Sequence, residues 1–194
     1  MNLECSVGKI KNAILLAERV TGKNLSLPIL ANVILETKDR ILKIKSTNLD
    51  LCLEINLPCK INQAGLVAIN GATLANFFNH LPPQEDKIKM ELSSGNLVIS
   101  SPSNSTKING YPADDFPIIP PITNAQSFIL PASHLVDALK MVWYSASFSN
   151  LKPEISSACF YQQADGLCLV ATDSFRLAEK KLTGAGVKIN HPHL

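Results

Sequence analysis

The feature that most constrains the fold is an order of secondary-structure elements that the chain repeats. A strand is predicted over Met1–Ser6, and apolar residues at helical spacing predict a helix over Gly8–Val20. Three runs rich in β-branched and aliphatic residues then predict strands over about Pro28–Glu36, Ile41–Ser46 and Asp50–Leu57. The unit is therefore one strand, one helix and three strands.

The same order returns further along the chain. A strand over Leu66–Ile69 precedes a helix over Gly71–Leu81, and three strands follow at Lys87–Leu92, Asn96–Ser101 and Ser105–Asn109. The sequence thus contains an internal repeat of about 60 residues.

A third copy begins after a connector rich in proline, Tyr111–Pro121, which favours extended chain. Its predicted elements are a strand at Ser127–Leu130, a helix at Pro131–Ala146, and strands at Ile155–Tyr161, Leu167–Thr172 and Arg176–Leu182. We therefore expect a first domain of two repeat units, residues 1–122, and a second, residues 123–194, of which only the first half is present.

The composition is that of an ordinary soluble globular protein, with 46% hydrophobic and 18% charged residues in a chain of 194. No apolar stretch reaches the roughly 20 residues that cross a bilayer, and Met1–Cys5 lacks the features of a secretory signal, so we expect a cytoplasmic protein. A net charge of +2 permits contact with nucleic acid without indicating it. Five cysteines at no metal-ligand spacing are expected to be reduced, buried small hydrophobes: Cys5, Cys52, Cys59, Cys159 and Cys168.

The sequence contains no motif that points to an enzyme. It has no phosphate-binding loop, no Gly-x-Ser-x-Gly and no His-Glu-x-x-His. Asp114 and Asp115 are either an acid–base pair or a solvated turn, and Asp173 is either catalytic or a turn aspartate that bonds nearby backbone; the turn is favoured for both. His191 and His193 are interpreted as a frayed tail rather than metal ligands. We therefore expect no catalytic residue, no metal and no cofactor.

Polar and basic corners recur at equivalent places in the repeats. Lys23 and Asn24 follow the first helix, and Ser149, Asn150 and Lys152 follow the third. Such corners suit contacts with a phosphate backbone, although each taken alone is more often a plain solvated loop.

Four ordered motifs resemble one known family, the bacterial DNA polymerase sliding clamp, which is the beta subunit of the replicative DNA polymerase. They are Leu27–Asn32, Thr47–Leu51, Tyr111–Pro117 and Ala171–Ala178. The resemblance implies an α+β fold, the DNA clamp fold, in which repeated β-α-β-β-β units place antiparallel sheets on the outside and helices along the hole of a ring.

The resemblance also implies the function of a processivity factor without catalytic activity. Such a clamp is a head-to-tail homodimer that encircles double-stranded DNA, is loaded by an ATP-driven clamp loader, and tethers the replicative polymerase and other proteins with clamp-binding motifs. Because a ring is retained by topology, its DNA contacts can be few and directed at phosphate. The implied DNA-binding residues are Lys9, Lys23, Asn24, Asn79, His80, Ser149 and Lys152.

Family clamps bind a short partner peptide in an apolar groove. The matching positions are Ile155, Thr172, Ser174, Phe175, Arg176 and Leu177. Ile155 and Leu177 would supply apolar walls, and Arg176 would bond the backbone or acidic groups of the peptide. Ser174 and Phe175 stand where Gly and His are commoner. From the residues alone, Phe175 is either an exposed anchor or a packed strand residue.

The dimer edge of the family is the last strand of its first domain. It matches Ser105–Asn109, in which Thr106 and Ile108 share one face. Family members have three domains, so the third is expected to be absent from this chain: either the chain is an N-terminal fragment of a longer gene product, which is favoured, or the protein is truncated. The alternative to a clamp is a truncated, clamp-like interaction scaffold that cannot close a ring. Either way, half a domain is expected to leave apolar faces uncovered.

Overall fold

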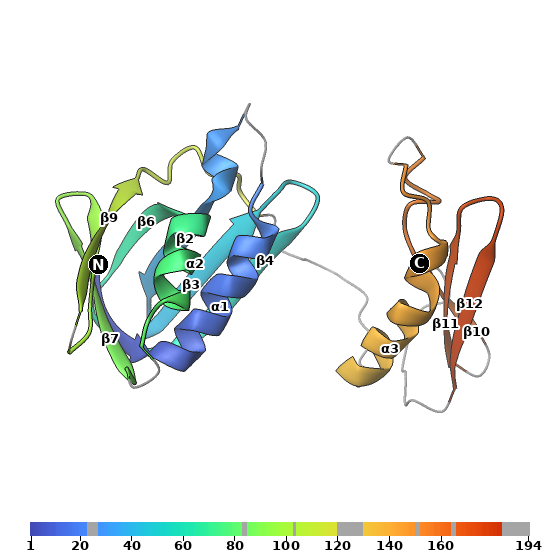
Figure 1. The fold of residues 1–194 in the computed structure, drawn as a ribbon, viewed down its shortest axis with the longest axis horizontal. Helices are drawn as coiled ribbons and strands as arrows, with labels where there is room; N and C mark the ends of the chain where they lie inside the picture. The colour runs from blue at the N-terminus through green and yellow to red at the C-terminus, as the bar shows by residue number, and fades with distance from the viewer. Residues whose placement is uncertain are drawn as a thin grey trace. The chain divides into compact units, whose positions relative to one another are not determined.

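The computed structural model divides the chain into two compact units, Met1–Pro120 (unit 1) and Pro121–Leu194 (unit 2), which are considered separately (Figure 1). The residues that it describes are 1–22, 27–82, 85–102, 104–119, 130–149, 152–163 and 166–183. No helix in these segments is long and apolar enough to cross a membrane.

Unit 1 contains two strand–helix–three-strand repeats, as predicted. The first holds β1 (Asn2–Ser6), α1 (Val7–Val20), η1 (Pro28–Ala31), β2 (Asn32–Lys38), β3 (Ile41–Thr47) and β4 (Cys52–Pro58). After β5 (Lys60–Gln63), the second holds β6 (Gly65–Asn70), α2 (Gly71–Asn79), β7 (Lys87–Ser93), β8 (Asn96–Ser100) and β9 (Ser105–Tyr111).

Two details of this unit differ from the prediction. The segment from Pro28 to Ala31 is a short 3-10 helix rather than the start of a strand, because the fixed φ of Pro28 suits the first helical position. The sequence pattern does not predict β5, since Ile61 is the one apolar residue among its four.

The repeat is visible in how the strands pair. The nine strands form one antiparallel sheet in the order β4-β3-β2-β6-β9-β8-β7-β1-β5. The first strand of each repeat pairs with a strand of the other repeat, so that β1 pairs with β7 and β6 with β2. Strands β4 and β5 stand at opposite ends of this order, yet Cys59 alone separates them in sequence. The sheet therefore bends back on itself, and Cys59 lies where its ends meet.

Helices α1 and α2 lie side by side on one face of the sheet (Figure 1). Between helices and sheet is a continuous apolar core that includes Leu3, Ile10, Ile14, Ile44 and Phe78, all fully buried. Each such side chain stabilises the fold by about 2 kcal/mol relative to an exposed position. The opposite faces of both helices are left facing water.

Unit 2 contains one copy of the repeat. Its elements are α3 (Ala132–Val142), η2 (Trp143–Ser145), β10 (Cys159–Gln163), β11 (Gly166–Thr172) and β12 (Leu177–Thr183). The strands form a sheet in the order β10-β11-β12, and α3 packs on β11 and β12. The strand predicted from Ile155 begins at Cys159 instead, because the Ser156 and Ser157 hydroxyls donate to the Pro153 carbonyl and close a turn. Of the strand predicted at Ser127–Leu130, residues 127–129 lie outside the described segments, and Leu130 is not in a strand.

Unit 2 follows the first repeat of unit 1 at a constant offset of 125 residues. It relates β3 (Ile41–Thr47) to β11 (Gly166–Thr172) and β4 (Cys52–Pro58) to β12 (Leu177–Thr183). The same offset relates Ser6 and Pro131, the residues that precede α1 and α3. Each described residue of unit 2 therefore has a counterpart in unit 1.

Candidate nucleic-acid and peptide interfaces

One face of α1 is exposed and carries two cations. Lys9, Asn12, Leu16 and Arg19 are all exposed, and their spacing places them on one helical stripe opposite the core. Of the predicted DNA contacts, Lys9 lies on this stripe. The sequence analysis missed Arg19, although its spacing of ten residues from Lys9 follows the same helical period.

The neighbouring helix contributes polar but uncharged groups. Asn79 and His80, both predicted, are exposed at the end of α2 together with Asn76. A His80 ring nitrogen, Nδ1, lies 2.8 Å from the Asn76 carbonyl oxygen, which ties the ring to the last turn of the helix. No residue of α2 carries a formal charge. The positive charge of this surface therefore comes from α1.

The sheet presents a different electrostatic surface on its outer face. Three of its cations are paired with acids: Lys43 with Glu54 (3.6 Å), Lys45 with Glu36 (2.7 Å) and Lys89 with Glu91 (2.7 Å). The hydrogen bond from Lys45 holds the pKa of Glu36 below its usual value. Within the described segments neither Lys9 nor Arg19 forms an ion pair. The helical face of unit 1 thus carries two exposed cations that no acid pairs within the described segments.

The other four predicted DNA contacts are not among the described residues of this helical face. Lys23 and Asn24 lie outside the described residues. Ser149 and Lys152 belong to unit 2, where both are exposed after η2, and the Ser149 backbone N–H donates to the Ser147 hydroxyl (3.2 Å). The structure therefore brings Lys9, Asn79 and His80 to one side of unit 1 and leaves the other four unassigned to it.

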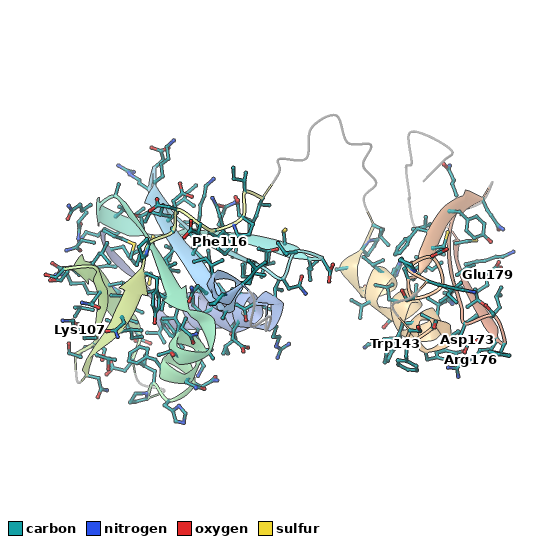
Figure 2. The ribbon with its side chains drawn as sticks, turned by 90° about the horizontal axis from the view of Figure 1, so that it is seen from above. Lys107, Phe116, Trp143, Asp173, Arg176 and Glu179 are labelled. Atoms are coloured by element: carbon teal, nitrogen blue, oxygen red, sulfur yellow. The ribbon has the colours of Figure 1, made fainter. Side chains whose placement is uncertain are left out.

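The predicted peptide site is built around a tight turn between β11 and β12. The Asp173 carboxylate accepts the backbone N–H groups of Phe175 (3.0 Å) and Arg176 (2.9 Å), and the Arg176 side chain donates to it at 2.9 Å (Figure 2). These backbone N–H groups, that of Arg176 first, hold the pKa of Asp173 below its usual value. The interpretation of Asp173 as a turn aspartate is confirmed.

The turn leaves its apolar side chains in water. Phe175 is 98% exposed and Leu177 is 66% exposed, so Phe175 is not a packed strand residue, and its role as an anchor stays a prediction. The Thr172 hydroxyl donates to the Arg176 carbonyl (2.7 Å), and Ser174 has a φ of 76°. The backbone N–H groups from Asp173 to Arg176 all donate within the turn, so a partner would meet mainly its side chains.

The backbone of Ile155 accepts a hydrogen bond that has an equivalent in unit 1. The Ser147 N–H donates to the Ile155 carbonyl at 2.8 Å, as Gly22 N–H does to Leu30 at 2.8 Å. A Cβ on Gly22 would lie 2.8 Å from Leu30 Cβ and 3.5 Å from Asn48 Cα, where Asn48 is the counterpart of Asp173. By this correspondence we infer that half-buried Ile155 lies beside the 172–177 turn.

The predicted dimer edge is partly open. Strand β9 pairs with β8 from Ser105 to Asn109, but with β6 only at Gly110 and Tyr111. Ile108 is 6% exposed and lies in the core, so its side chain is not available to a partner. Thr106 shares that side of the strand and is half-buried; the exposed residues from Ser105 to Asn109 are Ser105, Lys107, which is labelled in Figure 2, and Asn109.

The two acidic residues of the linker lie in an exposed turn, and the described segments hold no cluster of metal-ligand side chains. Asp114 and Asp115 are exposed in a turn closed by a hydrogen bond from the Phe116 N–H to the Ala113 carbonyl (3.1 Å). No group of three His, Cys, Asp or Glu side chains in those segments could hold a metal ion. His191 and His193 lie outside the described residues.

The fold is that of the sliding clamps. The chain matches a Thermotoga maritima DNA polymerase III beta subunit with a TM-score of 0.83 and 25% identity, covering 96% of this chain and 51% of that one. It matches the beta subunit of Pseudomonas aeruginosa with a TM-score of 0.88 at 19% identity, covering 100% and 52%.

Sequence comparison identifies the family. Residues 1–120 match the model of the DNA polymerase III beta subunit, N-terminal domain. The beta sliding clamp of Synechococcus elongatus is 26% identical over 187 residues, which is 95% of this chain and 50% of that protein. The beta sliding clamp of Buchnera aphidicola is 26% identical over 165 residues, 82% of this chain and 44% of that protein. The chain belongs to the DNA polymerase III beta subunit family, and it spans about half the length of these relatives.

Proposed function

We propose that this chain is part of a sliding clamp, a processivity factor without catalytic activity that encircles duplex DNA in the cytoplasm. The observation that carries the proposal is the match of residues 1–120 to the beta subunit family, on a fold that places α1 and α2 side by side. Residues 1–122 would form the first clamp domain and residues 123–194 the first half of the second.

The DNA contacts would come from the helical face of unit 1. Lys9 and Arg19 would meet phosphates, and Asn79 and His80 would add hydrogen bonds. Lys23, Asn24, Ser149 and Lys152 would extend the same inner surface. So few cations suit a ring, because a topological link does not need tight binding to keep the protein on DNA.

The proposed partners follow from the two other surfaces. The replicative polymerase, the clamp loader and other proteins with clamp-binding motifs would dock at the turn formed by Thr172, Ser174, Phe175, Arg176 and Leu177, with Ile155 beside it. Phe175 and Leu177 are the exposed apolar anchors there, and Arg176 supplies donors that Asp173 does not occupy. The edge of β9 at Thr106 and Ile108 would take the partner of a head-to-tail homodimer through its backbone.

The test measures retention on DNA of different topology. The product of the native gene is sized by light scattering and loaded with its clamp loader onto a nicked circle and onto a linear duplex of the same length. A clamp stays on circles and leaves linear ends. If the protein remains monomeric, or leaves both DNAs at the same rate, the proposal of a ring is overturned and the clamp-like interaction scaffold is the remaining alternative.

A further inference from the structure

Two cysteines meet where the ends of the unit 1 sheet come together. Strand β1 pairs with β5 so that Leu3 is opposite Ile61 and Glu4 is opposite Lys60. Continuing this register by one residue places Cys5 opposite Cys59, the single residue between β4 and β5. Side chains of directly opposed residues point to the same face of a sheet.

The hydrogen bonding around Cys59 favours a close approach. Its backbone N–H donates to the Arg40 carbonyl at 3.1 Å, which is on the β3 side. The N–H and C=O of one strand residue point the same way, so Cys59 turns no polar backbone group toward β1. Opposed residues without mutual hydrogen bonds have Cα atoms about 4.5 Å apart. That separation is within the range of about 4.4–6.8 Å found in disulfides.

Cys5 and Cys59 pack against the core of unit 1 and also border a cavity that is open to solvent. Both side chains are partly buried against the core of unit 1. Both also line an open cavity of about 500 Å³, together with Glu4, Ser6, Pro58, Lys60, Asp86 and Lys87. A small oxidant can therefore reach two sulfurs that the strands already hold near each other.

We propose that Cys5 and Cys59 are a redox-sensitive pair that a hydroperoxide converts into a cross-strand disulfide. The site is independent of the proposed clamp function, because it rests on the strand register and the cavity alone. The disulfide joins β1 to the corner between β4 and β5, and so closes the sheet covalently.

The reaction balances with hydrogen peroxide as the oxidant. The Cys59 thiolate attacks one peroxide oxygen, the O–O bond breaks, and sulfenic acid and hydroxide form; the hydroxide takes up the proton that the Cys59 thiol released and becomes water. The Cys5 sulfur then attacks the Cys59 sulfur, the S–O bond breaks, and a second water leaves. Two thiols lose two electrons, and one peroxide is reduced to two waters.

Within this proposal the first attack is assigned to Cys59, because its side chain is less deeply buried than that of Cys5. Burial, reinforced by the nearby Cys59, raises the pKa of Cys5 to about 12, so its thiolate is scarce near neutral pH. Burial also raises the pKa of Cys59, but a hydrogen bond with the Leu42 backbone opposes that effect. The charged groups that line the cavity come as two acids, Glu4 and Asp86, and two bases, Lys60 and Lys87.

The experiment treats the purified chain with hydrogen peroxide, blocks the remaining thiols with N-ethylmaleimide after denaturation, and maps the digest by mass spectrometry. We expect the five free thiols to fall to three, with one peptide linking Cys5 to Cys59 and reversal by dithiothreitol. The closed loop should raise Tm by about 5 °C.

Two variants serve as comparisons. Cys59→Ser should abolish both the linked peptide and the rise in Tm, whereas Cys52→Ser, which removes an exposed thiol on β4, should retain both. The proposal is overturned if the wild-type chain yields sulfinic acid at Cys59 without any link to Cys5. It is also overturned if the linked peptide joins Cys5 to another cysteine.

Discussion

The first repeat of unit 1 and its counterpart in unit 2 have the same local structure but different burial. At corresponding positions of their helices, Ile10 and Ile14 are 0% exposed, whereas Leu135 and Leu139 are only half-buried. Leu30 is buried and its counterpart Ile155 is half-buried. Local sequence therefore determines the helix, strands and turns of each copy, and the second repeat determines whether their apolar side chains leave water.

The uncovered side of unit 2 is extensive. In unit 1, α2 packs against α1, and unit 2 has no second helix of this kind among its described residues. Large apolar side chains are exposed on and after α3: Val136, Met141, Trp143, Tyr144 and Phe148. So many large apolar side chains exposed on one short segment are unusual unless another structure covers them.

Separating the units should produce the largest effect. A chain of residues 1–120 is expected to unfold cooperatively with a stability of about 5–10 kcal/mol, because its core is complete. Residues 121–194 alone should show helical circular dichroism, should unfold at much lower urea and in a broader transition than residues 1–120, and should bind a dye such as ANS that reports exposed apolar surface. A sharp unfolding transition of the isolated second piece would contradict the comparison.

Matched truncations in the two helices test the same difference at single residues. Ile14→Ala removes a fully buried side chain and should lower the free energy of unfolding of unit 1 by about 3–4 kcal/mol. Leu139→Ala at the corresponding position should lower that of unit 2 by about 1 kcal/mol. Urea titrations of the whole chain report unit 2 through Trp143, its one tryptophan, and both units through circular dichroism. Equal losses in the free energy of unfolding for Ile14→Ala and Leu139→Ala would show that α3 is covered in solution.

The surface charges of the two helices also differ. The counterparts of Lys9 and Arg19 in unit 2 are His134 on α3 and Tyr144 in η2, so neither of these two permanent cations has a cationic counterpart of that kind in unit 2. Replacing both Lys9 and Arg19 by Glu should weaken binding of a labelled DNA duplex by roughly tenfold per residue near 0.1 M salt. It should also reduce the slope of log affinity against log salt by about 2. Fluorescence anisotropy measures both quantities.

A control for this change exists on the other side of the sheet. Lys38→Glu makes the same change of charge beside Glu36 on the outer face. It should leave the salt slope unchanged. If Lys38→Glu and Lys9→Glu weaken binding equally, the attraction comes from net charge and not from the helical face.

How far the sequence predicts this structure depends on whether a feature is local. The helix at Val7–Val20 and the turn at Asp173 follow from apolar spacing and from an aspartate that bonds its own backbone. The core position of Ile108 does not follow from its strand alone, because alternation shows which residues share a face but not which face meets the helices. The pairing of Cys5 with Cys59 depends on a register between strands more than 50 residues apart, which no local pattern encodes.

The turn that begins at Asn48 in unit 1 and the equivalent turn at Asp173 in unit 2 give the prediction with the smallest expected effect. In unit 1, Asn48 Oδ1 accepts the N–H groups of Asp50 (3.1 Å) and Leu51 (2.7 Å), as Asp173 Oδ1 does in unit 2. The geometry is the same, but the carboxylate titrates and the amide does not. The change Asp173→Asn therefore gives the turn of unit 2 the residue that unit 1 has.

The direction of the pH effect follows from the lowered pKa of Asp173. A carboxyl group whose pKa is lower when folded adds stability above its unfolded pKa of about 3.9, and that stability is lost as pH falls through the folded pKa. In urea titrations followed by Trp143 fluorescence, wild-type unit 2 should thus lose a small increment of stability between pH 5 and pH 3 in addition to the loss shared with Asp173→Asn. Because Asp173 is in an exposed turn, the difference should be small. Parallel pH profiles for the two proteins would mean that the carboxylate adds nothing beyond what the amide oxygen of Asn48 already provides in unit 1.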